Sequence, residues 1–209
     1  MDLIIRNANL PDGRTGIDIG IKDRKIAVIE SSLSAKAAEE IDAAGKLVSP
    51  PFVDAHFHMD ATLSLGLPRL NQSGTLLEGI ALWGELKPHL TVEAIKERAL
   101  RYCDLAVARG LLAIRSHVDI CDQRLLAVDA LLEVRKEVAP YLDLQLVAFP
   151  QDGFFRAPKA SELLETALDR GVDLVGGIPH FERTMDEGKK SVEVLCRIAA
   201  ERGLRVDMH

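Results

Sequence analysis

Residues 47–60 read LVSPPFVDAHFHMD, a short apolar run that ends in two histidines one residue apart. Successive side chains on a β-strand point to opposite faces, so we expect His56 and His58 to point the same way and Phe57 the other way. Neutral imidazoles that converge at the end of a buried strand are typical ligands of a divalent metal ion. The alternative is that these two polar side chains only mark the place where a strand leaves the core.

Polar side chains recur at the ends of the other apolar stretches, which favours a shared site. Residues 204–209, for example, read LRVDMH and also end in a histidine. Catalytic groups in barrels of parallel strands lie at the carboxyl ends of the strands, so these side chains are expected to meet. In chain order they are His56 and His58, His117 and Asp119, Gln151 and Asp152, His180 and Glu182, and His209.

The pattern after residue 50 predicts strands that alternate with amphipathic helices. Thr91 is a suitable N-cap for one of these helices, and Gly110 is a typical residue at its end. Such alternation indicates βα units that build a parallel sheet or barrel. The expected strands are 52–56, 111–116, 142–149, 174–178 and 206–209, and the expected helices are 91–109, 123–138, 160–170 and 190–202.

Residues 1–50 show a different pattern, of short strands joined by turns. The expected strands are 3–8, 17–21, 25–29 and a pair within 41–48, with a tight turn at Asp23–Arg24. So short a segment cannot bury an independent core, and we expect another segment to complete it.

Composition excludes several classes of protein. The 209 residues include 26 basic and 32 acidic side chains, a net charge of −6. The sequence has no basic patch of the kind that would indicate a nucleic-acid partner. No apolar stretch is long enough to span a membrane, and the amino terminus lacks the pattern of a signal peptide. The three cysteines are widely spaced and odd in number, which indicates reduced thiols and the cytoplasm.

The pattern Asp54-x-His56-x-His58 after a small β domain resembles the amidohydrolase superfamily. Five further segments are similar to bacterial cytosine deaminases of that superfamily: PPFV at 50–53, NQSGTL at 71–76, HVD at 117–119, LQLVAFPQDG at 144–153 and IPHFE at 178–182. The resemblance implies an α/β fold, a distorted (β/α)8 TIM barrel with a small β-sandwich. Residues 1–50 would form part of the sandwich and residues 51–209 the first five strands of the barrel. The natural chain is then expected to continue for about another 200 residues.

The resemblance also implies roles for matching residues. His56, His58 and His209 would hold one divalent metal ion, Fe²⁺ or Zn²⁺. The side-chain amide of Gln151 would bind a ring N/O edge of the substrate, and the backbone carbonyl of Leu76 would accept a hydrogen bond from a ring N–H. The family's proton-shuttling glutamate, an aspartate metal ligand and a further active-site histidine would lie beyond residue 209.

Several other polar residues remain open between two interpretations. His117 and Asp119 could orient metal ligands through hydrogen bonds, or could form a satisfied polar pair in the core. The same choice applies to His180 and Glu182, which could also line the substrate pocket. Asp60 could support the ligand strand or be an exposed turn residue. Residues 70–86, which include Glu78 and Trp83, could be a loop over the pocket or a packed helix.

These observations predict a metal-dependent hydrolytic deaminase of cytosine or of a closely related cyclic amidine. Hydroxide generated at the metal would attack the amino-bearing ring carbon, and ammonia would leave. One alternative is an amidohydrolase of N-substituted aminotriazines of the N-isopropylammelide type. Another is an inactive fragment or a partner-dependent subunit. The expected partners are a nucleobase-like small molecule and further copies of the same chain.

Overall fold

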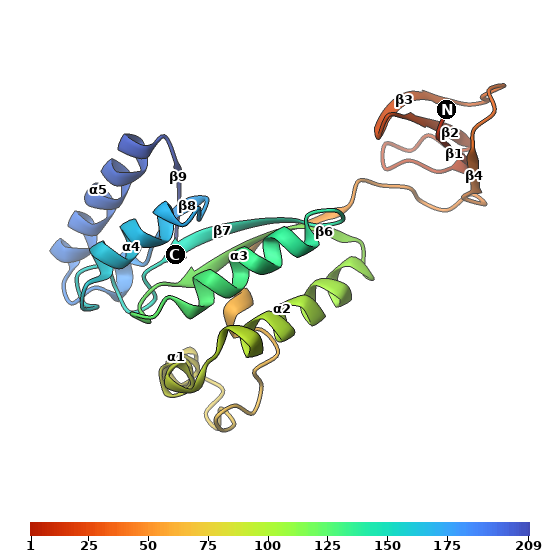
Figure 1. Ribbon diagram of the computed structural model, residues 1–209. Helices are drawn as coiled ribbons and strands as arrows, with labels where there is room; N and C mark the ends of the chain where they lie inside the picture. The colour runs from red at the N-terminus through yellow and green to blue at the C-terminus, as the bar shows by residue number, and fades with distance from the viewer. The chain divides into compact units, whose positions relative to one another are not determined.

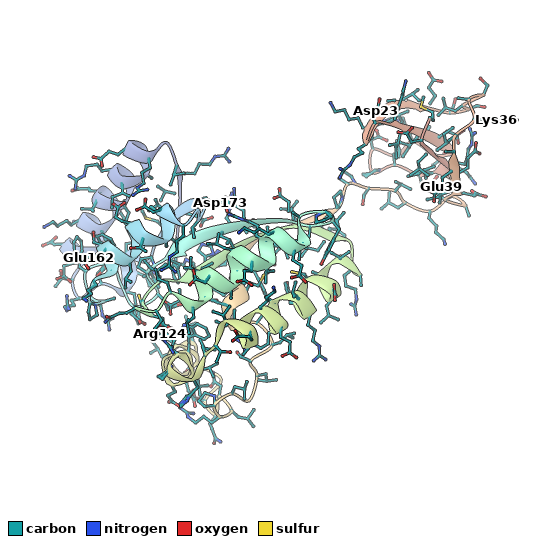
Figure 2. All side chains as sticks on the ribbon, in the orientation of Figure 1. Asp23, Lys36, Glu39, Arg124, Glu162 and Asp173 are labelled. Atoms are coloured by element: carbon teal, nitrogen blue, oxygen red, sulfur yellow. The ribbon has the colours of Figure 1, made fainter.

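The structure is a computed structural model that describes residues 1–209. The chain divides into two units, Met1–Pro51 and Phe52–His209, whose elements are labelled in Figure 1. Charged side chains cover the surfaces of both units; those labelled in Figure 2 include the exposed Asp23 and Lys36 in the first unit and Arg124 and Glu162 in the second. None of the helices has both the length and the apolar character needed to cross a membrane.

The first unit is a four-stranded sheet, which confirms the three strands predicted within residues 3–29. The pair of strands predicted within 41–48 was wrong: one strand occupies Glu39–Asp42, and Leu47 forms only an isolated bridge with Asn9. The strands of the sheet are β1 (Leu3–Ala8), β2 (Ile17–Lys22), β3 (Lys25–Glu30) and β4 (Glu39–Asp42), in the order β3-β2-β1-β4. β1–β2 and β2–β3 are antiparallel, and β1–β4 is parallel. Asp23 and Arg24 both have positive φ, which suits the tight turn between β2 and β3. The buried apolar cluster is small, with Ala8, Ile19 and Ala43 at its centre.

The second unit is a parallel five-stranded sheet. Its strands run β5 (Phe52–Phe57), β6 (Leu111–Asp119), β7 (Asp143–Phe149), β8 (Leu174–Gly177) and β9 (Arg205–Met208), and their order in the sheet is their order along the chain. α2 (Val92–Val107), α3 (Leu126–Val138), α4 (Ala160–Asp169) and α5 (Met185–Arg202) connect successive strands. Because parallel crossovers are right-handed, an unbroken sequential order places these four connecting helices on the same face of the sheet. The predicted succession of strands and helices is confirmed (Figure 1).

The main core lies between the sheet and these helices. The helices and the three central strands contribute side chains that are almost fully buried, and the edge strands β5 and β9 contribute partly buried ones such as Phe57 and Val206. This follows from the apolar stripe of each helix facing the strands. Examples of the almost fully buried side chains are Ile95 of α2, Ile114 of β6, Leu131 of α3, Leu146 of β7, Leu164 of α4 and Leu195 of α5. The opposite face of the sheet is left free to carry polar side chains.

Capping residues explain where several helices begin and end. Thr91 accepts a hydrogen bond from the backbone N–H of Ala94 at 3.1 Å, and Gly110 follows α2 with φ +82°, as predicted. The prediction for α5 was wrong at its start. This helix begins at Met185 rather than at residue 190, because the Thr184 hydroxyl caps it by accepting from the Glu187 N–H at 3.1 Å.

Residues 70–86, left open between a loop and a helix, contain helix α1 (Leu76–Leu86). Thr75 caps it by accepting from the Glu78 N–H at 3.3 Å. Leu82 and Leu86 are buried, so this helix is packed against the rest of the unit. The short 3₁₀ turn η2 (Lys87–His89) follows it, and His89 there is exposed.

Gly176 of β8 should tolerate no side chain, because an added Cβ would lie 2.5 Å from the Ala148 carbonyl oxygen. We expect Gly176→Ala to lower the free energy of unfolding by about 1–3 kcal/mol or more. Gly84, exposed in α1 with open space around it, is the matched control. Gly84→Ala should raise the free energy of unfolding by about 0.5–1 kcal/mol. Urea denaturation of both variants checks this, and equal effects would contradict the packing of β7 against β8.

Candidate active site

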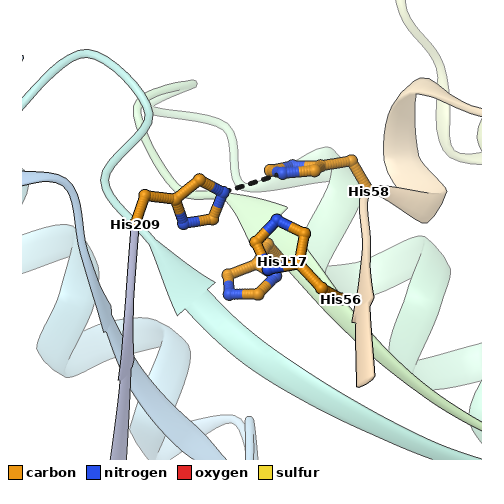
Figure 3. A group of neighbouring side chains, drawn as sticks. All are labelled: His56, His58, His117 and His209. Carbon is orange, nitrogen blue, oxygen red and sulfur yellow. Dashed lines mark hydrogen bonds between the residues drawn. The ribbon is translucent and has the colours of Figure 1, made fainter. Parts of the chain in front are cut away.

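Four histidines converge at the carboxyl ends of the strands. His56 and His58 come from β5 and the residue after it, His117 from β6, and His209 from the end of β9 (Figure 3). One nitrogen from each imidazole lies within 4.8 Å of those of the other three. The Nε2 atoms of His58 and His209 are only 3.0 Å apart. The structure thus brings together all three residues predicted as metal ligands, and adds His117.

The cluster joins the two opposite edges of the sheet. β5 and β9 are separated by three strands, so the imidazoles of His58 and His209 can approach only because the sheet curves. Polar side chains on the concave face also connect β6 to the edge strand β9. Asp207 of β9 accepts from Nη1 of Arg115 of β6 at 2.7 Å, and its other oxygen lies 3.3 Å from Nε2 of His117.

Arg115 and Asp207 were missed by the sequence analysis. The available signal was the period of two along each strand, which places Arg115 on the same face as His117 and Asp207 on the same face as His209. Arg115 also donates to the Gln145 side chain of β7 at 2.7 Å. These contacts tie β6 to β7 and β9 directly behind the imidazoles.

The imidazoles of His58 and His209 are held in the neutral form that metal ligation requires. Burial, reinforced by the neighbouring imidazoles, lowers the pKa of His58 to about 3 and that of His209 to about 4. The Nδ1 atoms of His117 and His209 are buried and have no hydrogen-bond partner in the protein. Several neutral nitrogen donors within a few ångströms of one another therefore fit a divalent cation such as Zn²⁺ or Fe²⁺.

A cavity of about 460 Å³ adjoins the imidazole cluster. His58 and His209 form part of its wall, together with the polar side chains of Gln151 and His180. Most of the remaining wall is apolar and comes from Leu76, Leu77, Ile80, Trp83, Ile178 and Phe181. An apolar cavity with a few convergent polar groups is typical of a site for a small molecule.

Both residues predicted to bind substrate line this cavity. Gln151 lies two residues after the last residue of β7, and its backbone N–H donates to the Phe149 carbonyl at 2.9 Å, which marks a sharp turn of the chain. Leu76 is the first residue of α1. Of the two residues whose position was left open, His180 lines the cavity and Glu182 does not.

Glu182 holds the loop that follows Gln151. Its carboxylate accepts from the backbone N–H groups of Phe154 at 2.6 Å and Phe155 at 3.1 Å. Hydrogen bonds from backbone amides to a carboxylate are short and strong, so they fix the course of the loop. Glu182 is thus tied by hydrogen bonds to the loop that follows Gln151 and does not line the cavity.

Asp60, which lines the cavity, and Asp119, which does not, are buried next to each other. Asp119 accepts from Nε1 of Trp83 at 2.7 Å, and its backbone N–H donates to the Asp60 carboxylate at 2.8 Å. Asp60 is 2% exposed, so the interpretation of this residue as an exposed turn acid is wrong. Burial raises the pKa of Asp60 to about 7.

A sequence model of the Amidohydrolase family matches residues 39–209, which contain all four clustered histidines. The chain belongs to the amidohydrolase family. This assignment confirms the superfamily indicated by the pattern Asp54-x-His56-x-His58.

Two types of amidohydrolase stand out among the relatives. The chain is 38% identical over 214 residues to N-isopropylammelide isopropyl amidohydrolase of Pseudomonas sp. (strain ADP), an alignment covering 100% of this chain and 53% of that protein. The solved structure of 5-methylcytosine deaminase from Klebsiella pneumoniae liganded with 5-fluorocytosine matches with a TM-score of 0.93 and 42% identity, covering 99% of this chain and 50% of that one.

A third relative is the solved structure of N-isopropylammelide isopropylaminohydrolase from Burkholderia multivorans. It matches with a TM-score of 0.84 and 29% identity over 100% of this chain and 53% of that one. The chain thus spans about half the length of the amidohydrolases it matches.

The ligand assignment predicts that His56→Ala removes the bound metal. Loss of one imidazole from a set of a few ligands should lower the metal content, measured by elemental analysis after dialysis, from about one ion per chain to background. His89→Ala, which changes an exposed histidine outside the cluster, is the control and should keep its metal. An unchanged metal content in His56→Ala would reject its assignment as a ligand.

Proposed function

We propose that the protein is a metal-dependent hydrolytic deaminase of cytosine or of a closely related cyclic amidine, such as a substituted cytosine. The observation that carries this proposal is the position of the Gln151 amide on the same cavity as the imidazoles of His58 and His209. The match to 5-methylcytosine deaminase over 99% of the chain supports it.

In this proposal His56, His58 and His209 hold one Fe²⁺ or Zn²⁺ ion. His117, which is fully buried and contacts Asp207, supports the ligands from behind. When bound, such a cation lowers the pKa of a water molecule and supplies hydroxide near neutral pH. The overall reaction adds water at the ring carbon that carries the amino group, forms a ring carbonyl and releases ammonia.

The residues of the cavity wall orient the ring. The Gln151 amide offers both N–H donors and a carbonyl acceptor, which matches the alternating N and O edge of a pyrimidine. The Leu76 carbonyl would accept from a ring N–H. Trp83, Ile80 and Phe181 provide an apolar surface for the ring faces and exclude water. The proton that ammonia needs to leave would come from a glutamate in the part of the family sequence that follows residue 209.

The same family relationship supports a proposal for the complete fold. Five parallel strands cannot close a barrel, and the matched relatives are about twice as long as this chain. We therefore expect three further βα units to complete a (β/α)8 barrel. Additional strands would complete a β-sandwich on the sheet formed by β1–β4.

A second candidate function is hydrolysis of an N-alkylated aminotriazine. The 38% identity to N-isopropylammelide isopropyl amidohydrolase over the whole chain supports it equally. The apolar wall formed by Ile80, Trp83 and Phe181 could accommodate an alkyl group. The two candidates would use the same metal ligands and add water at a ring carbon, and they differ in the amine that leaves.

Product analysis separates the two candidates. The complete natural polypeptide, loaded with Zn²⁺ or Fe²⁺, would be tested with cytosine, 5-methylcytosine, isocytosine, ammelide, creatinine and N-isopropylammelide. Ammonia released from a cytosine at the highest kcat/KM supports the deaminase. Isopropylamine released from N-isopropylammelide at the highest kcat/KM would instead support the triazine hydrolase and reject the deaminase.

Gln151→Ala should leave the metal bound and weaken catalysis. Loss of one or two hydrogen bonds to a neutral ring is expected to reduce kcat/KM by about ten- to a hundredfold. Gln123→Ala, which removes an exposed glutamine outside the cavity, is the matched control and should behave like the parent. Kinetics of Gln151→Ala within about threefold of the parent would reject a substrate role for this residue.

A further inference from the structure

A largely buried lysine links two separate walls of the cavity. Nζ of Lys87, which directly follows α1, lies 3.0 Å from an oxygen of Asp119 and 2.7 Å from an oxygen of Asp152. Asp119 is the last residue of β6, and Asp152 lies in the loop after β7, next to Gln151. The side chains of Lys87 and Asp119 are 14% and 4% exposed, so this part of the network is shielded from water.

Helix α1 makes a second hydrogen bond to Asp119. Nε1 of Trp83, one helical turn before Lys87, donates to the Asp119 oxygen that also faces Nζ of Lys87. α1 supplies Leu76, Ile80 and Trp83 to the cavity wall. One ammonium therefore connects the apolar wall of the cavity, through Asp152, to the loop that carries Gln151.

The electrostatics favour a permanent charge on the lysine. Burial disfavours the ammonium, but the carboxylates of Asp119 and Asp152 outweigh it and hold the pKa of Lys87 above its ordinary value. Burial also raises the pKa of Asp119, against the hydrogen bonds that it accepts from Lys87, Trp83 and the Cys121 N–H. Removing the ammonium would deprive the buried carboxylate of Asp119 of one hydrogen-bond donor. It would also break the contact that holds Asp152, whose side chain is 42% exposed.

The Gln151 loop has a second anchor on its other side. Glu182 accepts from the N–H groups of Phe154 and Phe155, as described above. Loss of the link between Lys87 and Asp152 should therefore loosen the Gln151 end of the loop without unfolding the rest. The loop is thus held to α1 through Asp152 at one end and to Glu182 at the other.

We propose that Lys87 is a positioning residue for substrate recognition, which joins helix α1 to the Gln151 loop through Asp119 and Asp152. This inference rests on the proposed role of Gln151 in binding the ring. Lys87 lies outside the imidazole cluster and does not line the cavity. Its effect on the reaction is exerted through Gln151 and α1.

Lys87→Met in the complete, metal-loaded polypeptide tests this proposal. With the best substrate of the panel above, we expect KM to rise by about tenfold while kcat changes by less than about threefold, because the metal and its ligands are untouched. Metal content should stay at the parent value. Lys87→Arg should recover part of the lost affinity, since it keeps a cation able to reach both carboxylates.

Lys96→Met is the matched control, because Lys96 also contacts two carboxylates, those of Glu133 and Glu137, but on the outer helices. Its KM should equal that of the parent. Asp152→Ala keeps the contact between Lys87 and Asp119 and removes only the link to the loop. It should raise KM in the same direction as Lys87→Met, and it covers the case in which Lys87→Met fails to fold.

A double variant distinguishes positioning from a general loss of structure. If Lys87 acts through Gln151, adding Lys87→Met or Asp152→Ala to Gln151→Ala should cost little beyond Gln151→Ala alone. Additive losses in the double variants, or KM within about threefold of the parent in both single variants, would overturn the proposal. Unchanged kinetics in Gln151→Ala would instead reject the substrate role of Gln151. The proposed effect of Lys87 through Gln151 would then be rejected as well.

Discussion

The approach of His58 to His209 is the contact on which the candidate active site depends. These residues belong to the two edge strands of a five-stranded sheet, yet their Nε2 atoms are 3.0 Å apart. Only a strongly curved sheet allows this, and parallel strands in sequential order with all their helices on one face provide such a curve. The curvature therefore does two things: it places the apolar core outside the sheet and gathers polar strand ends on the inside.

Two polar networks fix the geometry on the concave side. Arg115 and Asp207 link β6 to β9 behind the imidazoles, and Lys87 links α1 to Asp119 and Asp152 beside the cavity. Buried charges are costly unless they are paired and hydrogen-bonded, and each of these groups has partners at 2.7–3.3 Å. Such networks are weak evidence for stability but strong determinants of position, which is what a metal site and a ring-binding amide require.

Much of this architecture could be predicted from local sequence patterns. Alternation along β5 predicts that His56 and His58 share a face, and the apolar stretch that ends at His209 predicts that it joins them. Alternation also places Arg115 on the face of His117 and Asp207 on the face of His209. The partners of Lys87, Arg115 and Asp207 could not be predicted, because they are 30 or more positions away in the chain and are selected by tertiary packing. Helix α1 was ambiguous for a related reason, since its apolar residues face both a cavity and a core.

The central claim, that the curved sheet presents His56, His58 and His209 as ligands of one cation, is tested most directly by anomalous X-ray scattering. Crystals of the complete natural polypeptide loaded with Zn²⁺ would be measured at the zinc absorption edge. The account predicts one anomalous peak about 2.0–2.1 Å from a nitrogen of each of these three imidazoles. A zinc peak elsewhere, or one that leaves any of the three uncoordinated, would contradict it.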